Sequence, residues 1–189
     1  MTDLTVVYDA SVLYPAPLRD LLMWLALTDL YKARWTNEIH DEWMRNVLKN
    51  RPDLTLQQLT RTKNLMNSCV RDCLVEGYQS LILSLKLPDP NDRHVLAAAI
   101  CCNANIIVTF NLKDFPADVL KQYGIKAQHP DKFVFYLFSL DCDRVCQAAK
   151  RQRNTLKNPP KTLLEYLETL EKQGLPQTTA KLRELIEQL

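Results

Sequence analysis

Two short apolar runs constrain the fold of this 189-residue chain more than any other feature. The first is LTVVY at residues 4–8, and the second is NIIVT at residues 105–109. Both are nearly continuous rather than alternating, as in strands that are buried on both faces of a parallel sheet. Segments with helical periodicity alternate with the strands. The pattern therefore predicts an α/β fold with a central parallel sheet.

The other elements are predicted from periodicity and from helix start and stop signals. Helices are expected at about 18–31, 36–50, 55–73, 77–85, 90–102 and 117–122, and short strands at 34–35 and 126–128. From about residue 131 the chain is expected to be helical, with a break at residues 158–160, a helix stop at Gly174 and a last helix that carries Leu182, Leu185, Ile186 and Leu189. We expect an α/β domain at 1–140 and a helical C-terminal extension at 141–189.

Composition excludes several classes of protein. Hydrophobic residues make up 47% of the chain, so a core can form and disorder is not expected. Only three glycines occur, and neither a dinucleotide-binding motif nor a phosphate-binding P-loop can be drawn through them. The six cysteines contain no C-x-x-C pair, which favours buried or half-buried inert thiols over a zinc site. No N-terminal segment resembles a signal peptide or a membrane span, so a cytoplasmic location without membrane contact is expected.

Two aspartates lie at positions that are expected to be buried, where hydrophobic residues are usual. Asp9 follows the first strand, at the edge of a parallel sheet where α/β enzymes bind ligands, although a turn that bonds the backbone at Ser11 is an alternative. Asp92 opens a helix and shares its buried stripe with Val95, so it needs a partner or a metal. A helix-dipole role is the alternative, but Asp89 is already available for that.

Two further acids are weaker candidates. Glu42 lies four residues after Glu38 on one helix face, a repulsive pair that a cation would relieve, while pairing with Arg45 is the alternative. Asp114 follows the second strand and could instead cap a short helix after Pro116. If the four acids converge, their mutual repulsion requires a hard divalent cation.

The order and context of these acids resemble a known family. The segments are VYDAS at 7–11, Glu42 on an early helix, DPNDRHVLAAA at 89–99 and VTFNLKDF at 108–115. Together they resemble the PIN-domain nucleases, and most of all the VapC-type toxins of bacterial toxin–antitoxin pairs. The resemblance covers about residues 3–140, and the two later segments are its specific part. Many relatives carry an additional aspartate near the position of Asn111, so a neutral Asn111 could weaken a second metal site.

The resemblance implies a three-layer PIN-like fold and a Mg²⁺-dependent endoribonuclease with Asp9, Glu42, Asp92 and Asp114 as its metal-binding and catalytic acids. Asn111, Ser11, Asp89 and Glu38 are possible accessory residues. Oxygen-only ligands select Mg²⁺ or Mn²⁺, and such an ion activates a water that attacks the phosphodiester bond. The resemblance also implies an RNA substrate, a small antitoxin protein as inhibitor and a homodimer.

The sequence leaves three alternatives open. One stretch carries several cations and no acid, and it could follow a phosphate backbone or simply be solvated: Arg144, Lys150, Arg151, Arg153, Lys157 and Lys161. A metal-dependent phosphatase of the haloacid dehalogenase type would need an aspartate two residues after Asp9, where Ser11 stands. A catalytically weak PIN-like scaffold that binds RNA or protein is the non-enzyme alternative.

Overall fold

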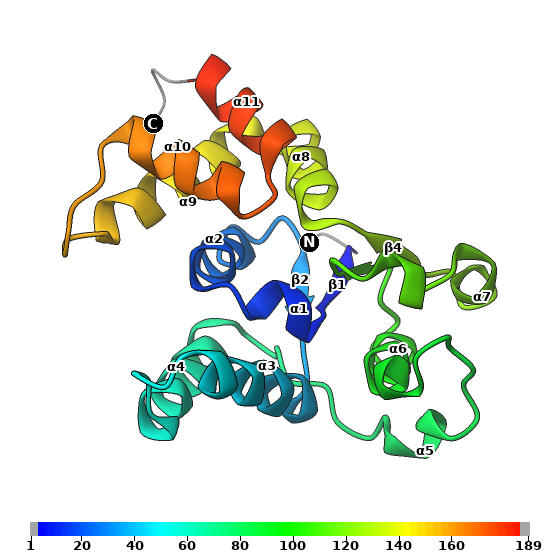
Figure 1. Cartoon of the computed structure of the whole chain (residues 1–189). Coiled ribbons are helices and arrows are strands. Elements are labelled where there is room, and N and C mark those ends of the chain that lie inside the picture. Colours follow the sequence, from blue (N-terminus) through cyan, green and yellow to red (C-terminus); the bar gives the residue numbers. More distant parts are fainter. Residues whose placement is uncertain (1–3, 186–189) are drawn as a thin grey trace.

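The computed structural model describes residues 4–185, and its centre is a parallel sheet. The strand order is β2–β1–β3–β4 (Figure 1), with β1 at Thr5–Tyr8, β2 at Lys32–Arg34, β3 at Ile106–Val108 and β4 at Lys126–Gln128. In the register of the two central strands, Tyr8 lies opposite Val108. Both runs that predicted buried strands, and the predicted parallel sheet, are confirmed.

Helices cover both faces of the sheet, which gives the predicted three-layer α/β architecture. Figure 1 shows α6 and α8 on opposite sides of β4. The helices of the α/β part are α1 (Ala10–Leu13), α2 (Ala16–Ala26), α3 (Asn37–Asn50), α4 (Leu56–Cys69), α5 (Gln79–Ile82), α6 (Arg93–Cys101) and α7 (Ala117–Lys121), with 3-10 turns at Pro90–Asp92 and Leu112–Asp114. They are followed by α8 (Pro130–Leu140), α9 (Cys142–Thr155), α10 (Leu163–Lys172) and α11 (Pro176–Glu184).

Three predicted helices differ in length from those observed. The helix predicted at 77–85 is a single turn, α5, and none of its residues is buried, so packing does not support a longer helix. The helix predicted to reach residue 73 ends at Cys69, where Val70 turns to an extended conformation. The helix predicted at 18–31 begins at Ala16 and ends at Ala26. The four-residue α1 was not predicted, because it is too short to show periodicity.

The C-terminal helices pack on the α/β part and on each other. Helix α9 runs along α2, and α8 contacts both α9 and α11. Gln152 on α9 donates to the backbone oxygen of Pro17 and accepts from the Tyr166 hydroxyl on α10, each at 2.8 Å. The predicted last helix is α11, with Leu182 buried, whereas Ile186 and Leu189 lie outside the described residues. The division at residue 140 stays a prediction.

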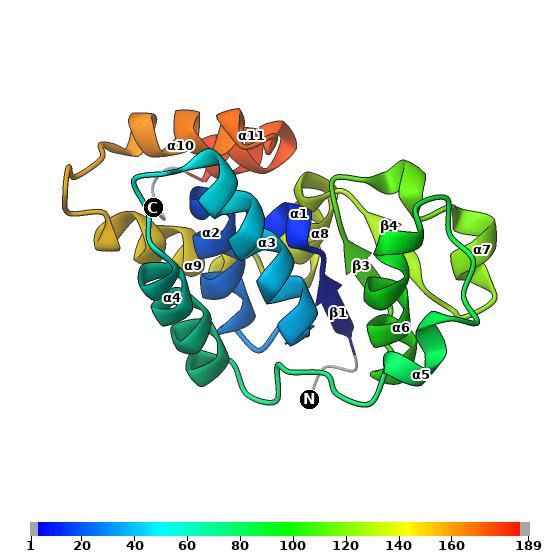
Figure 2. The same cartoon turned by 60° about the horizontal axis from the view of Figure 1, so that its bottom comes forward.

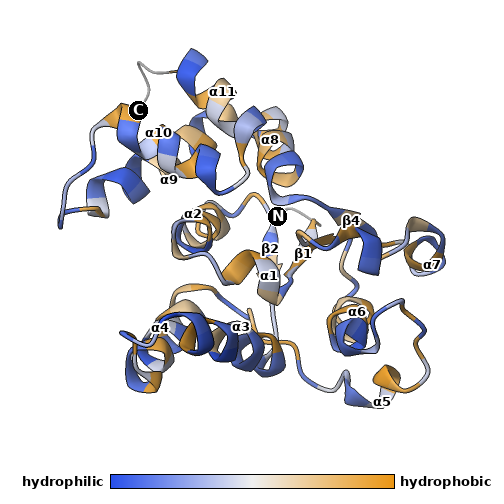
Figure 3. Ribbon diagram, in the orientation of Figure 1, coloured by the Kyte–Doolittle hydropathy of each residue, from blue (hydrophilic) through white to orange (hydrophobic). Residues whose placement is uncertain are grey.

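Hydrophobic side chains gather between the layers. Val6, Val7, Ile107 and Val108 are fully buried in the two central strands. Figure 3 shows α2 as largely hydrophobic and α3 as largely hydrophilic. All six cysteines are free, but Cys69 and Cys101 are exposed, so the expectation of buried or half-buried thiols is wrong for these two. No helix within residues 4–185 is long and apolar enough to cross a membrane.

Candidate active site

Asp9 lies at the carboxyl end of β1, between the strand and α1. Its backbone N–H donates to the oxygen of Val108 on the neighbouring strand at 3.0 Å, which ties it to the sheet edge. The side chain is only 2% exposed and accepts hydrogen bonds from the hydroxyls of Ser11 at 2.6 Å and Thr109 at 2.8 Å. Burial raises the pKa of Asp9; the two hydroxyls oppose the rise, and the charge of Glu42 adds to it.

The same two hydroxyls also hold the loop that follows β3. Ser11 Oγ accepts from the backbone N–H of Phe110 at 3.2 Å, and Thr109 Oγ1 accepts from that of Asn111 at 2.9 Å. The sequence reasoning assigned no site role to Thr109. The signal was available, because Asp9 and Thr109 each follow directly after paired strands and therefore meet at one sheet edge.

Asp92 is a buried carboxylate at the end of the 3-10 turn before α6. It is 8% exposed, and no hydrogen bond or ion pair within residues 4–185 involves its side chain. Its pKa is raised to about 7, mainly by burial and then by the charges of Asp9, Asp89, Asp114 and Glu42, in that order. Asp9, Glu42 and Asp114 come from other elements, so the fold brings the three other predicted acids within electrostatic range of Asp92.

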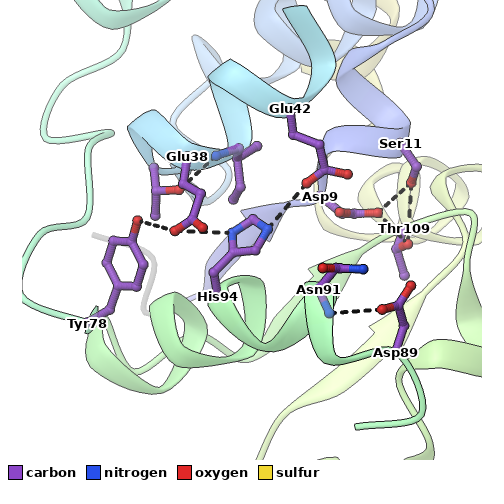
Figure 4. Close-up of polar contacts among 11 residues, drawn as sticks. Asp9, Ser11, Glu38, Glu42, Tyr78, Asp89, Asn91, His94 and Thr109 are labelled. Atoms are coloured by element: carbon purple, nitrogen blue, oxygen red, sulfur yellow. Dashed lines mark hydrogen bonds and ion pairs between the residues drawn. The ribbon is translucent and has the colours of Figure 1, made fainter. Parts of the chain in front are cut away.

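Glu42 contacts a residue that the sequence reasoning did not assign to the site. Its carboxylate Oε2 lies 3.2 Å from Nε2 of His94 on α6 (Figure 4), rather than pairing with Arg45. His94 Nδ1 lies 3.9 Å from the carboxylate of Glu38, which also accepts from the Tyr78 hydroxyl at 3.1 Å. Burial lowers the pKa of His94, but the bond to Glu42 and the charge of Glu38 outweigh it and raise that pKa overall.

The remaining predicted residues have different surroundings. Asp114 is half-buried at the end of the 3-10 turn Leu112–Asp114, and it does not cap the next helix, whose N-cap is Pro116. Asp89 accepts from the backbone N–H of Asn91 at 2.8 Å, which is a local capping role. Asn111 is exposed. Figure 4 shows Asp9, Glu42 and His94 pointing into one region between α3 and the turn that carries Asn91.

The donor chemistry fits a hard divalent cation, although the side chains do not form a closed cage. No group of three or more His, Cys, Asp or Glu side chains within residues 4–185 lies close enough to hold a metal ion. Asp9 and Asp92 are nevertheless buried carboxylates without a cationic side chain bonded to them in the described part of the chain. Magnesium usually keeps several waters and binds through one or two carboxylates, so two such acids suit it.

Comparison with known proteins gives three findings. The model of the PIN domain family matches residues 5–113, and the model described as the VapC50 C-terminal domain matches residues 130–184. The chain is 41% identical over 109 residues to the protein named "Putative ribonuclease VapC50" from Mycobacterium tuberculosis (strain ATCC 25618 / H37Rv). That alignment covers 58% of this chain and 63% of the relative, so it spans less than two thirds of the relative's length. The PIN match includes Asp9, Glu42 and Asp92 and ends one residue before Asp114.

Proposed function

The chain belongs to the PIN-domain family, and from that premise we propose that it is a Mg²⁺-dependent endoribonuclease, the toxin of a toxin–antitoxin pair. The observation that carries the proposal is the unbalanced charge around Asp92. A buried carboxylate whose pKa is raised to about 7 by burial and by other acids destabilises the metal-free folded protein when it is ionised. Such groups gather at functional sites, where a bound cation removes the cost.

Asp9 and Asp92 would hold the metal most directly, with Glu42 and Asp114 completing the acidic surroundings. When bound, Mg²⁺ would polarise a phosphate oxygen and lower the pKa of a water that attacks in line. Mn²⁺ would suit the same oxygen ligands. The four acids themselves remain a proposal, supported by their electrostatic proximity.

Neighbouring side chains would keep the acids in place. The hydroxyls of Ser11 and Thr109 fix the Asp9 carboxylate by two short hydrogen bonds, which favour its ionised form. His94 bridges towards Glu42 and Glu38, so it would orient Glu42 and offset part of the negative charge. Preorganisation of this kind is what positions reacting groups before the substrate arrives.

The proposed partners are an RNA substrate, a small antitoxin and a second copy of the chain. The relative's printed name supports the ribonuclease, and the VapC50 C-terminal match supports the toxin class. Lys150, Arg151 and Lys157 are exposed cations of the acid-free stretch, and they could contact RNA phosphates. Arg144 instead pairs with Asp141 at 3.2 Å, so it is less available. A cytoplasmic location accompanies this proposal.

The test is cleavage of a panel of RNAs by the purified protein with Mg²⁺, with EDTA and with Asp9→Asn. We expect cleavage only in the first case, because the substitution removes a ligand charge while keeping the side chain's shape. Loss of one interaction that acts in the transition state costs about 10²–10³ in rate. Ser11→Ala is a milder control, because it removes one hydrogen bond to Asp9 but leaves the Asp9 charge in place. Cleavage that survives EDTA or Asp9→Asn would defeat the mechanism.

One observation favours a second candidate, a PIN-like scaffold that binds without cutting. It is the lack of a three-ligand group among the described side chains. Titration with Mn²⁺ separates the two, since a scaffold should take up no ion. The phosphatase alternative has less support, because Ser11 donates to Asp9 where that class needs a second acid.

A further inference from the structure

Asp131 is a buried acid for which the proposed chemistry has no use. It is 3% exposed and lies at the start of α8. Its carboxylate accepts from the backbone N–H groups of Gln177 at 3.0 Å and Thr178 at 2.8 Å, in the first turn of α11. A buried carboxylate is tolerated when such charge-assisted bonds satisfy it, and the helix dipole adds to them. Asp131 therefore fixes the start of α11 on α8.

The start of α11 determines where the turn between α10 and α11 lies. Gly174 in this turn has a φ of +81° and lies against Phe110, since a Cβ there would be 3.6 Å from the ring carbon Cε1. The Phe110 ring in turn meets the ring of His129 edge to face, with centroids 5.1 Å apart. His129 Nδ1 accepts from the backbone N–H of Asp131 at 3.2 Å. The helical hairpin, Phe110 and the start of α8 thus form one packed unit (Figure 2 shows α10 beside α11, and α11 packs on α8).

Phe110 is one hydrogen bond away from the acidic site. Its backbone N–H donates to Ser11 Oγ at 3.2 Å, and Ser11 donates to Asp9 at 2.6 Å. The loop that begins with Phe110 also carries Asp114. A displacement of the Phe110 ring would therefore reach both the hydroxyl that holds Asp9 and the segment that holds Asp114.

We propose that Asp131 is a positioning residue of the acidic site, which acts by holding the α10–α11 turn against Phe110. The C-terminal helices then pack against the loop at residues 109–115 and hold it in place. That loop carries Thr109 and Asp114 to the site. The consequence for cleavage rests on the function proposed above. The link from Asp131 to the loop does not rest on that function, because it concerns only the hydrogen bonds of the loop.

Hydrogen exchange of the full-length protein tests the link without any use of activity. In Asp131→Ala we expect the amides of Phe110 and Asn111 to exchange faster by about tenfold, since loss of bonds to a charged group shifts local opening by that order. Asp131→Asn should give a smaller increase, because one oxygen remains to accept. In an active enzyme kcat should fall by about tenfold or more while KM changes less, as expected for misplaced groups.

Two controls separate local positioning from general loss of stability. Arg183→Ala removes the 2.7 Å ion pair with Glu171, which also joins α10 to α11 but is exposed and involves neither Asp131 nor the first turn of α11. Met66→Ala truncates a buried side chain on α4. In neither variant should the Phe110 and Asn111 amides exchange faster than the change in global stability accounts for.

The outcomes are distinct. Faster exchange of α11 amides in Asp131→Ala with unchanged Phe110 and Asn111 amides would overturn the proposal, because Asp131 would then only cap a helix. If Asp131→Ala does not fold, Asp131→Asn decides by the same criterion. In Phe110→Ala the effect of Asp131→Asn on the Asn111 amide should disappear, since the ring that transmits it is gone. If the wild-type protein cleaves no RNA, the function proposed above fails while the exchange result still decides this inference.

Discussion

At the scale of single residues, the candidate site consists of buried and half-buried acids with few partners. Asp9 has two hydroxyl donors, and Glu42 has His94, whereas the Asp92 side chain has no bonded partner among residues 4–185. Asp92 therefore carries much of the electrostatic cost. That cost is the physical reason to expect a cation, and it can be measured on the protein alone.

Asp92→Asn should stabilise the metal-free protein at pH 8. The pKa of Asp92 is raised to about 7 in the folded state, above its ordinary value of 3.8. The folded state therefore favours the protonated form of Asp92. The contribution of this group to the free energy of unfolding is fully present below the unfolded-state pKa and is lost as pH rises through 7. After allowance for solvent screening, we expect a gain of about 2 kcal/mol in the free energy of unfolding.

Urea unfolding in EDTA at pH 8 and pH 5.5 measures this difference. The gain should shrink at pH 5.5, where Asp92 is already protonated, and added Mg²⁺ should stabilise the wild type more than the variant. Asp118→Asn, which alters an exposed acid on α7, should change little at either pH. A variant that is less stable than the wild type at pH 8 would contradict the electrostatic account.

At the scale of elements, buried polar side chains join helices that are distant in sequence. Asp131 joins α8 to α11, and Gln152 joins α9 to α2 and α10. Both are buried, so each missing partner would leave an unsatisfied group. These bonds specify how the C-terminal helices lie on the rest of the chain, which apolar contacts alone specify less sharply.

Gln152→Ala should destabilise the protein by about 2–4 kcal/mol, because it leaves the Pro17 oxygen and the buried Tyr166 hydroxyl without partners. Tyr166→Phe should cost less, as only one acceptor is left unpaired. The matched control is Gln122→Ala on α7, whose side chain donates to the Val119 oxygen on an exposed surface. Equal midpoints for Gln152→Ala and Gln122→Ala in urea unfolding would show that Gln152 does not join these helices.

At the scale of the whole molecule, two family models match adjacent parts of one chain. The contacts of α9 with α2 and of α8 with α11 nevertheless cross any boundary near residue 140. We therefore expect the two parts to unfold together, although a division into 1–140 and 141–189 remains the prediction from sequence.

Equilibrium unfolding can be followed by two probes that report on different parts. All three tryptophans, Trp24, Trp35 and Trp43, lie in the α/β part, whereas far-UV circular dichroism reports on all helices. The two transitions should coincide if the protein unfolds in one step. Separate midpoints for the wild type would show that the extension unfolds independently. Gln152→Ala serves as a comparison, because weakened docking should make separation easier to detect.

Sequence by itself determined β1, β3 and β4, most helices and the family, because these depend on local periodicity and on short motifs, whereas β2 lies at Lys32–Arg34 rather than at the predicted 34–35. Continuous apolar runs predicted β1 and β3, and the acids after them predicted the sheet edge at which the candidate site lies. Local patterns could not determine long-range partners. The pairing of Glu42 with His94, the bond from Thr109 to Asp9 and the capping of α11 by Asp131 join residues that are 52, 100 and 47 positions apart. Only the packing of the helices on the sheet decides such contacts, because it alone sets which distant side chains share a buried space.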